Sequence, residues 1–198
     1  MTLADDRQKW NRRYQDQLEA GATPEPNALA LQFCDHVHGG ILLDAACGLG
    51  AGIAATIGRV DRAIGVDLSE SALRAARRTW GAHPKIQWIQ ADVANLVWPR
   101  GTFSVVCAFG FTDWTFLSQV PSILRPGGVF FYQGFSRRQL EVKPSLNPDW
   151  TSTPDRILAL FPGWHLLACA ESQGPPFRLQ FAGQRPVDDL REPECVSG

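Results

Sequence analysis

The chain has 198 residues, of which 44% are hydrophobic and 20% charged, and its formal net charge is −1. This composition is ordinary for a soluble globular protein, and the length suits one domain, residues 1–198, with a substantial core. The weak net charge gives no electrostatic footprint for a polyanion, so nucleic acid is not expected as a partner. No apolar run approaches the roughly 20 residues of a membrane helix, so no membrane partner is expected.

The five cysteines are scattered, with no C-x-x-C pair and no histidine cluster at metal spacing. A disulfide framework and a metal site are therefore not expected. The first 13 residues are polar and charged and lack the apolar core of a signal peptide. Together these features favour a cytoplasmic protein.

Two helices are predicted in the N-terminal segment, residues 1–38. The first covers about residues 4–18 and places Trp10 and Tyr14 one turn apart on the same face. The second covers residues 27–38, beginning at a capping asparagine and ending at a pair of glycines.

From residue 40 the sequence alternates between short apolar runs and helical stretches. Strands are predicted at 41–45, 62–67, 85–90, 103–109, 129–135, 164–171 and 177–184, and helices at 53–57, 69–80, 114–124 and 153–161. The proline at position 121 is expected to break its helix early.

This alternation predicts an α/β fold: a Rossmann-like, doubly wound, mostly parallel sheet of seven strands in a three-layer sandwich. The last two strands are expected to pair, which adds an antiparallel strand near the edge. The core is assigned to residues 40–185, and residues 186–198 are expected to form a flexible tail.

A glycine-rich turn follows the first predicted strand, in the segment Leu43-Asp44-Ala45-Ala46-Cys47-Gly48-Leu49-Gly50. Ligands of such sheets bind outside the carboxyl ends of the strands, where this turn lies. A dinucleotide site needs a third glycine, and counting from Gly48 that position is Ile53. The carboxylate of Asp44 would repel a pyrophosphate but attract an ammonium group. The turn therefore disfavours a nicotinamide dehydrogenase and favours a ligand that carries a cationic amino-acid group.

Two more acids end the second and third predicted strands. Asp67 lies 19 residues after Gly48, where a carboxylate can accept hydrogen bonds from ribose hydroxyls. Asp92 is placed to accept a hydrogen bond from the amino group of adenine. Three acids at successive strand ends, in register with a glycine turn, are a far stronger signal than any one of them.

These residues resemble the class I S-adenosylmethionine-dependent methyltransferases. Segment 43–50 resembles the first motif of that family, with Ala46 where glycine is commonest, and segments 64–69, 90–93 and 124–128 resemble later motifs. The resemblance implies S-adenosylmethionine as the cofactor and S-adenosylhomocysteine as its product. The residues expected to bind the cofactor are Trp10, Tyr14, Asp44, Ala46, Cys47, Gly48, Gly50, Asp67, Leu68, Asp92, Val93, Ala108 and Phe109.

Segments 9–14, 25–27 and 134–140 resemble small bacterial methyltransferases of the tellurite-resistance type, with thiopurine methyltransferases as more distant relatives. In such proteins the N-terminal region folds over the cofactor, so the resemblance implies that Trp10 and Tyr14 form a lid. The alternative is that both side chains lie on the face of the helix that packs against the hydrophobic core. Where those proteins carry a Tyr-His-Arg-like segment, this chain has 175–178, which keeps an arginine but no histidine. Tellurite is therefore not the expected substrate.

The loop 108–114, after the fourth predicted strand, is expected to lie beside the transferred methyl group. The residues predicted to line the acceptor pocket are Phe111, Trp114, Phe135, Arg138 and Arg178. Asp113 is the only acid in the loop and a weak candidate for a general base, the alternative being a helix N-cap.

The expected function is methyl transfer to a small molecule, with a thiol or another soft nucleophile favoured by the resemblance. The alternative is a non-catalytic protein that binds S-adenosylmethionine or S-adenosylhomocysteine as a sensor or regulator. The sequence leaves open whether the protein is a monomer or a homodimer.

Overall fold

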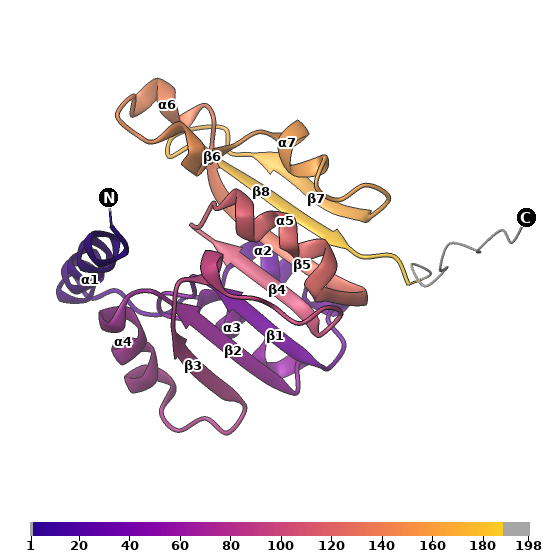
Figure 1. The fold of residues 1–198 in the computed structure, drawn as a ribbon, viewed down its shortest axis with the longest axis horizontal. Helices are drawn as coiled ribbons and strands as arrows, with labels where there is room; N and C mark the ends of the chain where they lie inside the picture. Colours follow the sequence, from indigo (N-terminus) through magenta and orange to yellow (C-terminus); the bar gives the residue numbers. More distant parts are fainter. Residues whose placement is uncertain (1, 188–198) are drawn as a thin grey trace, which may run out of the picture.

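A computed structural model describes residues 2–187, in which one mostly parallel sheet carries helices on both faces (Figure 1). The strands are β1 (Ile41–Ala45), β2 (Arg62–Asp67), β3 (Ile86–Gln90), β4 (Phe103–Phe109), β5 (Leu124–Ser136), β6 (Thr151–Ser152), β7 (His165–Glu171) and β8 (Arg178–Gln184). Their order across the sheet is β3-β2-β1-β4-β5-β8-β7, and the short β6 pairs with β5 off this path. Strands β1 to β5 are parallel, whereas β8 is antiparallel to both of its neighbours. The predicted fold class is confirmed.

The α-helices are α1 (Leu3–Glu19), α2 (Ala28–Gln32), α3 (Ala51–Thr56), α4 (Glu70–Trp80), α5 (Trp114–Ile123), α6 (Gln139–Val142) and α7 (Pro154–Leu158). Helices α2 and α3 cover one face of the sheet, and α5 and α7 cover the other (Figure 1). Polar caps begin several of them: the side chains of Ser69, Asp113 and Thr153 accept backbone N–H groups at the starts of α4, α5 and α7. Each such cap stabilises its helix by about 1 kcal/mol.

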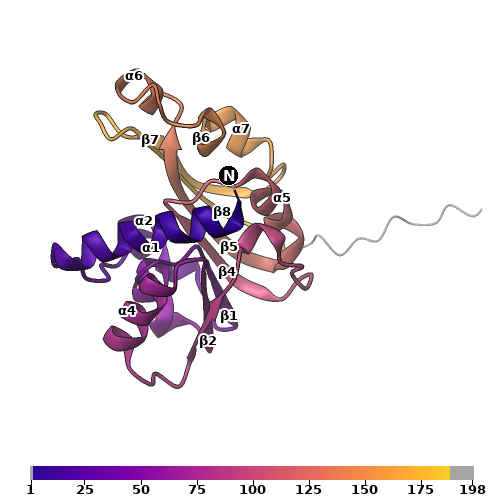
Figure 2. The ribbon, with the colours of Figure 1, turned by 60° about the vertical axis from the view of Figure 1, so that its left-hand side comes forward.

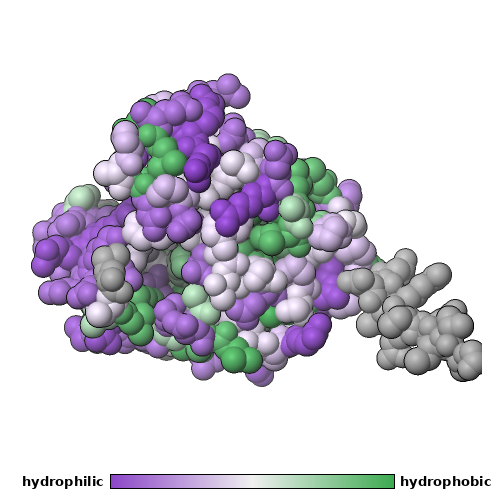
Figure 3. Space-filling view, turned by 45° about the horizontal axis from the view of Figure 1, so that its top comes forward, coloured by the Kyte–Doolittle hydropathy of each residue, from purple (hydrophilic) through white to green (hydrophobic). Residues whose placement is uncertain are grey.

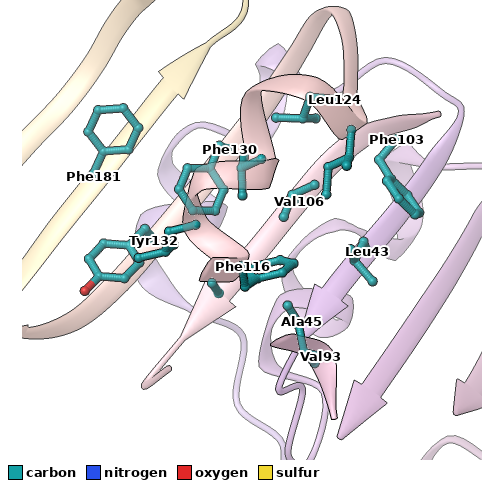
Figure 4. Close-up of a cluster of buried hydrophobic side chains, with 14 of the residues drawn as sticks. Leu43, Ala45, Val93, Phe103, Val106, Phe116, Leu124, Phe130, Tyr132 and Phe181 are labelled. Atoms are coloured by element: carbon teal, nitrogen blue, oxygen red, sulfur yellow. The ribbon is translucent and has the colours of Figure 1, made fainter. Parts of the chain in front are cut away.

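The core consists of two hydrophobic clusters, one on each face of the sheet. The cluster under α5 contains Phe116, Phe130 and Phe181, which lie close together in Figure 4 with side chains of β1 and β4. The cluster under α2 and α3 includes the buried side chains of Leu29 and Ile53. Because both faces of the central strands are covered, the sequences of those strands are almost continuously apolar.

The segment predicted as one helix over residues 27–38 is interrupted. Helix α2 begins at the predicted cap, where Asn27 accepts the backbone N–H groups of Leu29 and Ala30, but it ends at Gln32. A separate 3₁₀ turn, Cys34–His36, follows it. Phe33 separates the two with φ −114° and ψ 18°, which lies outside the α-helical region.

The proline in α5 does not break the helix where the sequence predicts. Pro121 lies inside α5, which continues to Ile123. The guanidinium of Arg185 donates to the carbonyl oxygens of Pro121 and Leu124, at 2.9 and 2.6 Å. The C-terminal turn of α5 thus gains hydrogen bonds from a side chain near the end of β8.

The C-terminal strands pair as predicted, since β7 and β8 form an antiparallel ladder with β7 at the sheet edge. The segment between β5 and α7 holds elements that the sequence analysis did not predict: α6, a 3₁₀ turn at Pro148–Trp150 and β6. Elements of two to four residues are too short to show a hydrophobic period. Of the predicted tail 186–198, residues 188–198 lie outside the described residues.

The surface is mixed in character. The face shown in Figure 3 is mainly hydrophilic, with hydrophobic side chains in separate patches. Within residues 2–187, no helix combines the length and the apolar composition needed to cross a membrane.

Candidate functional site

A cavity of about 520 Å³ opens at the carboxyl ends of β1 and β4. Its walls come from α1, the loop between α1 and α2, the glycine-rich turn, the ends of β1 and β4, and the start of β8. The lining residues are Tyr14, Gln17, Ala22, Thr23, Pro24, Glu25, Asp44, Ala46, Cys47, Gly48, Leu49, Ala51, Phe109 and Arg178. The volume lies within the range of small-molecule sites.

The turn that forms the cavity floor needs left-handed backbone at several positions. Gly48 and Gly50 have φ of 53° and 93°, and Ala46 has φ of 51°. Among the described residues, Ala46 is the sole non-glycine residue in this region of φ. Left-handed backbone strains an L-residue by roughly 1–2 kcal/mol, which explains why glycine suits this position.

Two glycines of this segment let other groups approach closely. A Cβ on Gly48 would lie 2.4 Å from the hydroxyl oxygen of Tyr14, and one on Gly52 would lie 2.8 Å from the carboxylate carbon of Asp44. A real Cβ essentially never lies this close to a heavy atom to which it is not bonded. The absence of side chains therefore brings Tyr14 over the turn and Asp44 against the start of α3.

Asp44 is the penultimate residue of β1 and is almost fully buried, at 1% exposure. Its Oδ2 accepts the backbone N–H of Ile53 at 3.1 Å, in the first turn of α3. Burial raises the pKa of Asp44 to about 7, the amides of Ile53 and Gly52 act in the opposite direction, and the nearby charge of Asp67 raises it further. A buried carboxylate that lines a cavity is a strong site for a cationic ligand group, because such a group would stabilise the ionised form.

Asp67 ends β2 and connects that strand to the turn. One carboxylate oxygen accepts the N–H of Gly48 at 2.8 Å and the other accepts the N–H of Ser69 at 2.7 Å. Burial raises its pKa, and the backbone N–H groups oppose that shift. Asp67 lies behind the turn rather than in the lining of the cavity.

The residues predicted for the adenine end lie farther along the same edge. Asp92 caps a 3₁₀ turn, accepting the N–H of Ala94 at 3.0 Å and the side-chain amide of Asn95 at 2.7 Å. Val93 is buried in the core, and the carbonyl of Leu68 accepts a hydrogen bond from the side chain of Gln90. The structure thus brings Asp67 and Asp92 to the same sheet edge but leaves both outside the cavity lining.

Helix α1 runs beside α4 at this edge of the sheet (Figure 2). The side-chain oxygen of Asn11 accepts the hydroxyl of Ser69 at 2.9 Å and the N–H of Ser71 at 3.2 Å. Tyr14 follows one turn later and lines the cavity, where burial raises its pKa. Trp10 lies away from the lining, within cation–π distance of Lys9 and Arg13.

Of the remaining residues predicted for the cofactor, Ala46, Cys47 and Phe109 line the cavity, whereas Gly50 and Ala108 do not. Ala108 is fully buried in the core. Gly50 faces the rings of two tryptophans, since a Cβ there would lie 3.1 Å from Trp80 and from Trp88.

Of the residues predicted for the acceptor, Arg178 lines the cavity and the other four do not. Phe111 packs against Phe116 with a ring separation of 5.9 Å. The indole N–H of Trp114 donates to the carbonyl of Asp149 at 3.0 Å, and the guanidinium of Arg156 lies 3.6 Å from its ring centre.

The last two acceptor candidates lie near β8. Arg138 stacks on Phe177 at 4.2 Å and lies 3.9 Å from Glu141. Phe135 lies beneath the guanidinium of Arg178, at 5.4 Å.

The candidate general base has a structural role in this arrangement. Asp113 caps α5, with its carboxylate accepting the N–H of Phe116 at 2.8 Å. Burial raises the pKa of the Cys47 and Cys107 thiols, which disfavours either as a nucleophile. Over residues 2–187 no group of three metal-ligating side chains is found.

Several lining residues were not identified from the sequence. Gln17 and the loop residues 22–25 lie before the glycine-rich turn in the chain. Of these, only Glu25 falls in a segment with a family resemblance, 25–27, and that resemblance gave it no role in the site. The loop is tied to the sheet at Asn27, whose amide donates to the side-chain oxygen of Gln133 at 3.1 Å. That long-range contact has no local sequence signal.

Comparison with known proteins agrees with the fold and with the position of the turn. Residues 42–128 match a family model described as a methyltransferase domain. A 2-phytyl-1,4-naphtoquinone methyltransferase of Thermosynechococcus vestitus is 28% identical over 138 residues, which cover 64% of this chain and 60% of the relative. The chain thus spans less than two thirds of that relative.

Solved structures share the fold at low sequence identity. One, titled for the conversion of a disulfide bond into a thioacetal group during echinomycin biosynthesis, has a TM-score of 0.60 and 21% identity, covering 85% of this chain and 84% of that one. A protein from Listeria monocytogenes, described as a putative S-adenosylmethionine-dependent methyltransferase, has a TM-score of 0.61 and 15% identity, covering 78% and 95%. Residues 42–128 are thus similar to a methyltransferase domain, and the chain shares the Rossmann-like fold of the Listeria protein.

Proposed function

We propose that this protein transfers the methyl group of S-adenosylmethionine to a small-molecule acceptor. The observation that carries the proposal is the buried carboxylate of Asp44 in the wall of a cavity whose floor is a glycine-rich turn. This combination suits a ligand with an ammonium group, and the side-chain-free turn permits close approach of that ligand to the backbone.

The residues present fit the cofactor. Asp44 is the proposed partner of the amino group, and the backbone of residues 46–48 would lie against the amino-acid end of the ligand. We place the ribose and adenine beside Asp67 and Asp92. Asp67 already accepts two backbone N–H groups, so ribose hydroxyls would use its remaining lone pairs.

The cofactor supplies an electrophilic methyl group bonded to a sulfonium. The task of the chain is to align the acceptor with that methyl group and to exclude water, which can contribute roughly 7–11 kcal/mol to catalysis. We place the acceptor next to Phe109, the lining residue at the end of β4. Asp113 is committed to the helix cap, so the arrangement suits an acceptor that ionises without a base, such as a thiol.

Two relatives bear on the acceptor. The curated relative is named for a naphthoquinone, a small molecule, and one structural neighbour is titled for chemistry at a disulfide. A small thiol or another soft nucleophile is the acceptor class that we propose, because segments 9–14 and 134–140 resemble methyltransferases of the tellurite-resistance type.

The test is methyl transfer from S-adenosylmethionine, labelled in its methyl group, to a panel of small thiols, phenols, reduced quinones and amines. Label in a thiol product supports the proposal. Label in another small molecule would show that the acceptor belongs to a different chemical class. Tight binding of S-adenosylhomocysteine with no transfer to any acceptor would favour a sensor. Binding of NAD in place of S-adenosylhomocysteine in calorimetric titration would overturn the proposed cofactor.

A further inference from the structure

The charged residues that line the cavity come from distant parts of the chain. Glu25 lies in the loop between α1 and α2, Asp44 at the end of β1 and Arg178 at the start of β8. Burial raises the pKa of the other two titratable lining groups, the phenol of Tyr14 and the thiol of Cys47, so both stay neutral. The cavity therefore offers two carboxylates and one guanidinium.

Strand direction explains why the arginine is present. Because β8 runs antiparallel to β5, its first residue lies at the edge where β1 to β5 end, and Arg178 pairs in register with Phe135. The backbone there is fixed by Ser172, whose hydroxyl accepts the N–H of Arg178 at 2.9 Å while its own N–H donates to the Arg178 carbonyl. The start of β8 thus holds Arg178 at the ligand-binding edge.

The guanidinium of Arg178 has no acidic partner and no hydrogen-bond acceptor within residues 2–187. In the described part of the chain the guanidinium lies over the ring of Phe135, at 5.4 Å, and this contact leaves the N–H donors free. The side chain is partly buried. A partly buried guanidinium with five free donors matches a carboxylate, which can accept two parallel hydrogen bonds from it.

We propose that Arg178 binds the α-carboxylate and that Glu25, with Asp44, binds the α-amino group of S-adenosylmethionine. The end of β1, the start of β8 and the 22–25 loop would then form a subsite for the zwitterionic amino acid, with two carboxylates and one guanidinium in its lining. This inference rests on the proposed function. It assigns Arg178 to the binding of the methyl donor, whereas the sequence analysis assigned it to the acceptor pocket.

Two ligands that differ only at the amino-acid end test this subsite. S-adenosylhomocysteine carries the ammonium and the carboxylate, whereas 5′-methylthioadenosine keeps the adenosine and the thioether but lacks both charges. Isothermal titration calorimetry would compare the wild-type protein with Arg178→Gln and Glu25→Gln. Arg100→Gln and Glu19→Gln, at exposed positions outside the cavity lining, are matched controls for the loss of each charge.

Arg178→Gln should weaken S-adenosylhomocysteine binding about 10- to 100-fold and leave methylthioadenosine binding unchanged, because a charge-assisted pair is lost. Glu25 is exposed, so Glu25→Gln should weaken only S-adenosylhomocysteine, by about two- to fivefold. Arg178→Lys keeps the charge and should recover part of the loss. Thermal unfolding of each variant shows whether it is folded.

An equal loss of affinity for both ligands in a folded Arg178→Gln protein would overturn the proposal, because the defect would then not be specific to the carboxylate. Unchanged S-adenosylhomocysteine affinity together with a raised KM for a carboxylate-bearing acceptor such as 2-mercaptobenzoate would assign Arg178 to the acceptor instead. In both cases the proposed function stands. It fails separately, and this inference with it, if the wild-type protein binds neither adenosine ligand.

Discussion

The N–H of Gly48 donates to the carboxylate of Asp67 at 2.8 Å, which ties the glycine-rich turn after β1 to the end of β2. The second carboxylate oxygen accepts the N–H of Ser69, the residue that caps α4. One side chain thus organises two backbone segments that line the same edge of the sheet. Asp67 therefore has a structural role in addition to the cofactor role proposed for it.

Replacing Asp67 with alanine should reduce both cofactor affinity and stability. We expect S-adenosylhomocysteine binding to weaken by about 1–3 kcal/mol through the loss of charge-assisted hydrogen bonds. The amides of Gly48 and Ser69 also lose their acceptor, so the midpoint of thermal unfolding should fall. Calorimetric titration and thermal unfolding measure the two effects.

Asp67→Asn is the matched variant, because one amide oxygen can still accept from the backbone. It should recover part of the stability but little of the affinity. Unchanged affinity in Asp67→Ala would remove Asp67 from the cofactor site and leave only its structural role.

The docking of α1 should depend on Asn11, whose side chain accepts hydrogen bonds from Ser69 and Ser71 of the α4 start. Asn11→Ala removes this acceptor, and we expect amide hydrogen exchange within α1 to become faster, by about a factor of 5–10 if one net hydrogen bond is lost. Gln8→Ala, at an exposed position of the same helix, is the control and should leave exchange unchanged.

The same measurement addresses the predicted lid. If α1 closes over the cofactor, S-adenosylhomocysteine should protect the amides around Tyr14 in the wild-type protein more than in Asn11→Ala. Equal protection in both proteins would contradict a role for the Asn11 contact in closure.

The sheet and the floor of the site follow from local sequence signals. The strands up to β4 were predicted within one residue of their observed bounds, because buried parallel strands form uninterrupted apolar runs between turn residues. Asp44 and Gly48 were identified from one segment because the turn and its acid are adjacent in sequence. The fold then necessarily brings the two to the same edge.

The lining residues from the 22–25 loop and from β8 could not be predicted in the same way. Glu25 lies in an irregular loop whose position depends on the bond from Asn27 to Gln133, more than 100 residues away. Arg178 reaches the cavity because β8 inserts antiparallel between β5 and β7, a property of the strand order. Neither contact leaves a periodic pattern in the sequence, so the sequence assigned Arg178 to the acceptor and did not identify Glu25.

Ala46 offers a test of backbone strain, since it has φ of 51° where glycine would be unstrained. Ala46→Gly removes about 1–2 kcal/mol of strain but adds about 0.4–1 kcal/mol of unfolded-chain entropy, so we expect unchanged or slightly higher stability. The control is Ala45→Gly, in the buried end of β1, which should destabilise the protein by roughly 1 kcal/mol. Chemical denaturation measures the free energy of unfolding of both variants. A loss of stability in Ala46→Gly as large as in Ala45→Gly would show that the backbone at Ala46 is not strained.

The raised pKa of Asp44 predicts how stability depends on pH in the absence of ligand. Burial moves this pKa from 3.8 to about 7, so the folded protein holds the proton more tightly than the unfolded chain does. The free energy of unfolding should therefore fall as pH rises from about 4 to about 7 and stay low above that, by at most about 4 kcal/mol from this group. Asp44→Asn should reduce this fall, as measured by denaturation at pH 5 and pH 8.

Ligand binding should show the opposite dependence on pH. An ammonium group beside Asp44 favours the ionised carboxylate, so S-adenosylhomocysteine should bind about tenfold more tightly at pH 8 than at pH 6, with proton release at the lower pH. Methylthioadenosine, which lacks the ammonium, should show no such increase, and Asp44→Asn should bind S-adenosylhomocysteine weakly at both values. Equal S-adenosylhomocysteine affinity at pH 6 and pH 8 in the wild-type protein would contradict the combination of a raised Asp44 pKa and an ammonium group beside it.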